Sequence, residues 1–195
     1  DVTLTSGALK VEANNEVTLN LNGKKLTNQA GANTIEVAAG GTLTIEGPGT
    51  VDNVSHQKAA VNNSGTVVLN GGTYTRSQEK GTSEEDSGSN SYYTILNHGT
   101  MTINEGVTVN QGENGAGKFS SLIENGWYNG NNNTGGELSV MTINGGTFSG
   151  GLNTIKNDDY GELTIKGGTF NSDEIDNFGT IEGGTFSGKI LSRGV

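Results

Sequence analysis

The sequence predicts an all-β protein, a right-handed parallel β-helix of about seven coils without substantial α-helix. Short segments recur along the chain, apolar residues alternate with Thr inside them, and Gly-Gly pairs follow many of them. Gly accounts for 33 of the 195 residues and Pro for only 1, which suits many tight turns because Gly accepts positive φ angles. Units this short cannot bury their apolar side alone, so they are expected to stack.

Each repeat consists of a strand, a turn and a second short strand. In residues 42–45, Leu43 and Ile45 alternate with two Thr residues, which places the apolar side chains on one face of a strand. Further copies lie at residues 66–74, 100–104, 141–148, 163–170 and 180–186. The alignment places one apolar residue of each copy at the same inward-facing position: Leu21, Ile45, Leu69, Ile103, Ile143, Ile165 and Ile181. This alignment gives a base coil of about 22 to 24 residues, and longer steps predict loops that leave the stack.

A corner rich in Asn is predicted before each copy. A shorter strand there ends on an apolar residue, at Val37, Val61, Ile95, Ile123, Ile155 and Ile175. Two residues later comes Asn63, Asn97, Asn125, Asn157 or Asn177, whereas the first of these coils has Ala39. Coils stacked at about 4.8 Å would bring these amides within reach of one another, as a ladder. The alternative is that each Asn only occupies a left-handed turn position.

The overall composition limits the class of partner. The net charge is −10 and the isoelectric point is near 4.5, which argues against nucleic acid or an anionic membrane surface. The absence of Cys excludes disulfides and thiolate metal sites. No apolar run approaches the roughly 20 residues that span a bilayer, so no membrane insertion is expected.

Three copies, at residues 141–150, 163–172 and 180–188, share the unit Thr-Ile-x-Gly-Gly-Thr-Phe. They resemble the repeats of adhesin-like proteins on the surface of Gram-positive gut bacteria. Residues 17–24 resemble the first coil of pectate-lyase-like β-helices. The resemblance covers almost the whole chain and implies an extracellular setting, secreted or associated with the cell wall. It says little about activity, because one fold hosts many functions. In the absence of a sortase-type anchor, the chain is expected to be one module of a longer surface polypeptide.

The whole chain, residues 1–195, is expected to form one β-helix domain with three loop insertions. These lie near residues 77–91, 111–120 and 125–138. Loops on a rigid scaffold are common places for binding residues, so candidate sites are sought there first.

Four aromatic residues in or beside these loops are the candidates for ligand binding. Trp127 and Tyr128 lie in a loop rich in Gly and Asn, where a ring and neighbouring amides suit a sugar. The alternative is that Trp127 folds back and fixes its own loop to the coil. Tyr92 and Tyr93 are weaker candidates, because Tyr93 is in phase with Ile95 and can point inward.

No catalytic or metal site is predicted. Polysaccharide-cleaving β-helices would need clustered carboxylates with a basic residue, but neither Arg, Arg76 or Arg193, is near the paired acids Asp158 and Asp159. These acids are expected in a solvated turn, with weak Ca²⁺ binding as the alternative. No other cofactor is expected. His98, beside ladder position Asn97, is expected to serve in a turn.

The sequence therefore predicts a non-catalytic extracellular module, adhesin-like or a stalk, with a glycan or a host cell-surface protein as the candidate partner. The alternative is a polysaccharide lyase or hydrolase. A minor alternative is an ice-binding protein, suggested by the outward Thr pairs 42/44 and 100/102. Breaks in that pattern at Val68, Val140 and Glu162 count against it.

Overall fold

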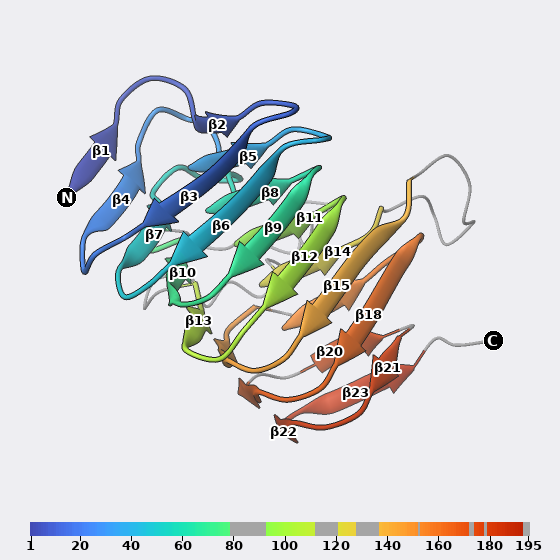
Figure 1. Cartoon of the computed structure of the whole chain (residues 1–195). Coiled ribbons are helices and arrows are strands. Elements are labelled where there is room, and N and C mark those ends of the chain that lie inside the picture. Colours follow the sequence, from blue (N-terminus) through green and yellow to red (C-terminus); the bar gives the residue numbers. More distant parts are fainter. Residues whose placement is uncertain are drawn as a thin grey trace.

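The protein is described by a computed structural model that covers residues 1–78, 93–111, 121–127, 137–151, 153–171, 174–177 and 179–192. Every regular element in these residues is a β-strand, and the strands form three parallel sheets (Figure 1). The predicted insertions fall mostly outside the described residues, as do the candidates Tyr92 and Tyr128.

The chain visits the three sheets in turn, so each strand pairs with the strand three places further on. Sheet A contains β1 (Val2–Leu4), β4 (Lys25–Asn28), β7 (Thr50–Asn53), β10 (Gly72–Thr75), β13 (Val107–Val109), β16 (Thr147–Ser149), β19 (Thr169–Asn171) and β22 (Thr185–Phe186). Sheet B contains β2 (Leu9–Val11), β5 (Ile35–Val37), β8 (Val61–Asn63), β11 (Ile95–Asn97), β14 (Ile123–Asn125), β17 (Ile155–Asn157), β20 (Glu174–Asn177) and β23 (Lys189–Ser192). Sheet C contains β3 (Glu16–Asn20), β6 (Thr42–Glu46), β9 (Thr66–Leu69), β12 (Thr100–Ile103), β15 (Ser139–Ile143), β18 (Gly161–Ile165) and β21 (Thr180–Ile181). This topology confirms the predicted parallel β-helix of about seven coils.

The core is a set of columns in which equivalent apolar residues of successive coils stack. In sheet C one column runs through Ile45, Leu69, Ile103, Ile143 and Ile165, all fully buried. In sheet A the rings of Phe148, Phe170 and Phe186 stack with centroids 4.7 and 4.8 Å apart and planes 7° from parallel. The Gly-Gly turns before these rings use positive φ angles, 107° at Gly146 and 113° at Gly168. The alternation read from the sequence therefore does face a common core.

The predicted register is wrong in the first coils, by two residues. Ile45 pairs with Leu19, whereas Leu21 lies in the turn after β3, where it is also buried. In sheet B, Val61 pairs with Ile35, so Val37 and not Ala39 occupies the position of the later Asn residues. The cause is a longer corner between β5 and β6, which residues 38–41 close with a turn. The misalignment arose because a fixed corner length was assumed.

The amide ladder is present and buried. Asn63 donates to Asn97, Asn97 to Asn125 and Asn125 to Asn157, each from Nδ2 to Oδ1 at 2.7 Å. The four side chains are at most 1% exposed, and none has the positive φ that the turn alternative requires. The ladder is therefore a set of side-chain bonds between coils. The side chain of Asn177, at the end of β20, lies outside the described part.

The ladder also holds the backbone of the corner. Asn97 Nδ2 donates to the carbonyl oxygens of Gly99 and Val140, while its Oδ1 accepts from the Gly99 amide. A Cβ on Gly99 would overlap the carbonyl oxygen of Gly65 one coil below, so the corner needs Gly as well as Asn. A second amide chain lies outside the stack: Asn144 donates to Asn104, and Asn104 to Asn70.

Replacing Asn97 with Leu is expected to lower the free energy of unfolding by roughly 1–3 kcal/mol, because it leaves buried partners in the ladder unpaired. Asn104→Leu in the exposed outer chain is the matched control, expected to stay within about 0.5 kcal/mol. Urea unfolding followed by circular dichroism would measure both. Equal effects of the two substitutions would contradict the structural role of the inner ladder.

Candidate functional site

The outer side of sheet B and its corner toward sheet C carry two columns that contain several ionisable side chains. The central residues of successive sheet B strands form one outward column: Lys10, Glu36, Asn62, Leu96, Glu124 and Lys156. The residues that follow these strands form a second column at the corner: Glu12, Ala38, Ser64, His98, Gly126 and Asp158. Backbone hydrogen bonds between coils hold this second column in line. The two columns place residues that are far apart in sequence side by side on one face.

Trp127 packs against the stack of coils, as in the second of the two roles predicted for it. Its indole stacks on His98 of the preceding coil, with ring centroids 3.7 Å apart and planes 11° from parallel. Its Nε1 donates to the Glu137 carbonyl oxygen at 2.8 Å. Its backbone amide donates to the backbone carbonyl oxygen of Asp159, also at 2.8 Å. Burial lowers the pKa of His98, which favours the uncharged ring. The indole is partly exposed, so it retains some surface toward solvent.

Tyr93 is not an exposed aromatic residue. Only 5% of it is accessible, and a hydrogen bond joins its hydroxyl to the carboxyl group of Glu124. Burial, with the nearby carboxylates of Glu124 and Asp158, raises the pKa of the Tyr93 phenol. The inward direction noted from its phase with Ile95 is consistent with this burial.

The acids Asp158 and Asp159 are buried, so the expected solvated turn is wrong. They are 5% and 6% exposed. Lys156 holds Asp158 in an ion pair, with Nζ 2.7 Å from Oδ2, and Asp159 pairs with Trp127 in an isolated antiparallel bridge. Sequence reasoning missed Lys156 as the basic partner, although its alternation with buried Ile155 marks it as outward-facing.

Glu124 belongs to the same buried cluster and has an unusual acidity. Burial raises its pKa to about 8; Asp158 adds to the rise, while Lys156 and the bond to Tyr93 oppose it. The group is therefore largely protonated at neutral pH. A carboxylic acid with this pKa could act as a general acid, but only 5% of Glu124 is accessible. Sequence reasoning did not single out Glu124, because nothing local to it reports burial.

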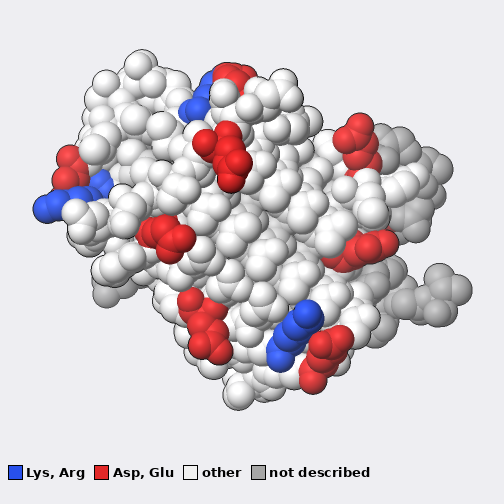
Figure 2. All heavy atoms as spheres, viewed as in Figure 1, with Lys and Arg blue, Asp and Glu red and all other residues white. Residues whose placement is uncertain are grey.

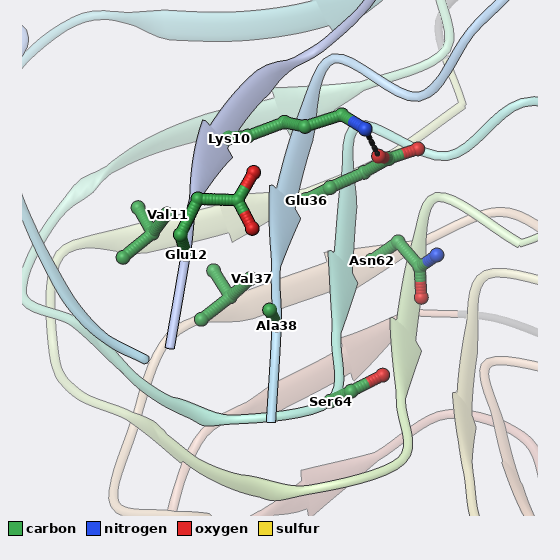
Figure 3. A pocket seen from close by; sticks show the side chains of 8 residues that line it. All are labelled: Lys10, Val11, Glu12, Glu36, Val37, Ala38, Asn62 and Ser64. Atoms are coloured by element: carbon green, nitrogen blue, oxygen red, sulfur yellow. Dashed lines mark ion pairs between the residues drawn. The ribbon is translucent and has the colours of Figure 1, made fainter. Parts of the chain in front are cut away.

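An open polar groove lies nearer the N-terminus, over β2, β5 and β8 (Figure 3). Its volume is about 270 Å³. The polar residues Lys10, Glu12, Glu36, Asn62 and Ser64 line it together with Ala38. Val11 and Val37 also border it, but their side chains are buried in the core. Sequence reasoning missed this groove. The alternation along each strand places Lys10, Glu36 and Asn62 on its outer face, and this could have revealed the groove. The register error in the second coil concealed that the three residues align.

The polar groups of the groove are positioned by contacts between coils. Lys10 Nζ lies 3.6 Å from Glu36 Oε2, and Asn33 Nδ2 donates to Glu36 Oε1 at 3.0 Å. Lys10 and Glu36 remain accessible, with side chains 58% and 33% exposed. The Asn62 Oδ1 atom is buried and has no hydrogen-bond partner among the described residues. The groove therefore offers one ammonium, two carboxylates and an amide with an unused acceptor.

The outer face of sheet C, turned toward the reader in Figures 1 and 2, carries columns of Thr. One column contains Thr44, Val68, Thr102 and Thr142 in direct register, so Val68 interrupts it as predicted. The adjoining column is interrupted by Val140 and Glu162. In Figure 2 the acidic side chains on this side of the molecule lie apart from one another and form no acidic cluster.

Polar residues at the corner between sheets A and B were also missed by sequence reasoning. Asn28 and Asn53 are buried and donate to loop carbonyl oxygens, Asn53 to those of Ala32 and Ala59. Asp52 is fully buried, pairs with Lys25 and accepts a bond from the backbone amide of the loop residue Ser77. These contacts anchor the loops.

Comparison of the chain with family models, curated proteins and solved structures gave no match. Among the described residues, no cluster of three or more His, Cys, Asp or Glu is arranged to hold a metal ion. The described part of the chain also has no helix long and apolar enough to cross a membrane.

Glu124 is expected to make stability depend on pH. Its pKa rises from the ordinary 4.5 to about 8 on folding, so the folded state holds a proton that the unfolded state has lost. Stability from this group is complete below about pH 4.5 and declines as the pH rises through about 8. Glu124→Gln keeps a neutral group beside Tyr93 and is expected to flatten the decline. Thermal unfolding between about pH 5 and pH 8 would measure it.

The matched control is Glu162→Gln, which changes an exposed carboxylate on the outer face of sheet C. It is expected to leave the pH dependence of unfolding as in the unaltered protein. If the Glu124→Gln protein loses stability with pH as steeply as the unaltered protein, the assignment to Glu124 is wrong.

Proposed function

We propose that the chain is a non-catalytic extracellular module, adhesin-like, in which a stiff β-helical stalk presents a binding face. In this proposal it is secreted or held at a bacterial cell wall as part of a longer polypeptide. Its partner is a glycan or a host cell-surface protein.

The observation that carries the proposal is the arrangement of polar groups around the stack. The buried amide ladder and the stacked apolar columns join successive coils, which favours a stiff rod. The outward column of sheet B and the neighbouring corner column gather the open groove and the partly exposed Trp127 on one side of that rod. A stiff support with its binding groups on one side is what an adhesive module needs.

A non-catalytic role is supported by the state of the acidic groups. Glu124 has a pKa suited to proton transfer but is nearly inaccessible. Asp158 is neutralised by its ion pair with Lys156. Catalysis of glycosidic cleavage by two carboxyl groups requires both to reach the scissile bond, one of them protonated.

One observation favours the alternative, a polysaccharide-cleaving enzyme. The groove brings Glu12 and Glu36 of adjacent coils together with the basic residue Lys10, the combination that lyase or hydrolase chemistry uses. The two functions differ in what happens to a bound glycan, because an adhesin releases it unchanged.

A panel of immobilised plant, bacterial and host glycans would test the proposal, with binding and product release measured on the same protein. Binding without new reducing ends and without unsaturated products is expected. Release of either product, abolished by Glu36→Gln, would overturn the non-catalytic proposal and favour the enzyme. Absence of binding to every glycan and to host-cell surfaces would overturn the adhesive role.

A further inference from the structure

The groove over β2, β5 and β8 presents mainly polar groups, with a small apolar surface at Ala38. The side chains of Val11 and Val37 belong to the core and are only 3% and 2% exposed, so they add little surface to it. The charged and amide groups suit the hydroxyls of a sugar. In Figure 3 Lys10 and Glu36 of adjacent coils meet in an ion pair, and the carboxylate of Glu12, on the same coil as Lys10, lies beside them.

The polar groups offer both donors and acceptors to a ligand. Carboxylate oxygens of Glu12 and Glu36 accept from hydroxyl groups, and the Lys10 ammonium donates to a hydroxyl or ring oxygen. The Lys10–Glu36 pair is wide, at 3.6 Å, and accessible, so a hydroxyl can insert without breaking a buried contact.

Asn62 provides an independent observation. Its Oδ1 atom is buried in the wall of the groove and has no hydrogen-bond partner in the described part of the chain. Buried polar atoms are nearly always satisfied, so this acceptor lacks a donor that a bound hydroxyl can supply.

The charge of the groove selects among sugars. Two carboxylates and one ammonium leave it with a net negative charge, on a chain whose net charge is −10. An acidic sugar would be repelled, whereas a neutral sugar meets no such penalty. The Lys10 ammonium already pairs with the Glu36 carboxylate, so the sugar itself does not need to carry a cationic group.

We propose that this groove binds one neutral sugar unit of a glycan through Lys10, Glu12, Glu36 and Asn62. The inference rests on the proposed function, because it names the ligand class and the place of binding for the adhesive module. The site lies outside the three loop insertions and does not use Trp127.

Titration of the isotope-labelled protein with neutral sugars would test it by nuclear magnetic resonance. The probes are methyl glucoside, methyl galactoside, lactose and N-acetylglucosamine, compared with glucuronic and galacturonic acids and with glucosamine. At least one neutral sugar is expected to shift the backbone amides of β2, β5 and β8, while the acids shift them less. The double variant Lys10→Met/Glu36→Gln is expected to weaken this binding at least about tenfold.

Glu162→Gln on sheet C is the matched control and is expected to bind the neutral sugar as the unaltered protein does. Binding elsewhere on the protein with a silent groove would overturn this inference and leave the proposed adhesive function standing. Preference for an acidic sugar, or for glucosamine in a salt-sensitive manner, would overturn the assignment of a neutral ligand.

Discussion

The register of one coil on the next is the constraint on which the rest of this structure depends, and the buried amide ladder is the contact most specific to it. Each ladder amide from Asn63 to Asn157 bonds to its neighbour and to the backbone of its own corner. A shift of one residue would move every apolar side chain of the strand to the outer face. It would also leave the buried ladder amides without hydrogen-bond partners. Hydrophobic columns accept many residues, whereas the ladder accepts one spacing.

This register determines where polar chemistry can gather. Because strands pair in line, side chains from residues 26 to 34 positions apart become neighbours on the outer face of sheet B. At the early coils they line an open groove, whereas at the later coils Glu124 and Asp158 are buried and the Lys156 side chain is only 12% exposed. The same two columns therefore contain an accessible ion pair, between Lys10 and Glu36, and a buried one. Their difference in exposure separates a candidate for ligand binding from a contributor to stability.

The fold could be read from the sequence because its determinants are local: alternation with period 2, Gly-Gly turns and recurrent Asn are visible within a few residues. The ladder could be predicted from the spacing of the Asn residues alone. The register of the first coils could not, because Val11 and Val37 replace Asn at the corner and the corner is longer there. The burial of Asp158 was not predictable, since it depends on contacts with other coils. The groove escaped notice for a related reason, because its polar groups come from three coils whose alignment required the correct register.

The two amide chains also give the stack a direction. In the inner ladder every side chain donates toward the C-terminal coil, whereas Asn144 and Asn104 outside it donate toward the N-terminal coil. Hydrogen bonds arranged head to tail polarise one another, so each chain behaves as a line of aligned dipoles. The two lines point in opposite senses along the rod, and their axial dipoles offset each other. The outer line ends where Asn70 donates to the carboxylate of Glu46, an anion at the accepting end of a chain of neutral amides.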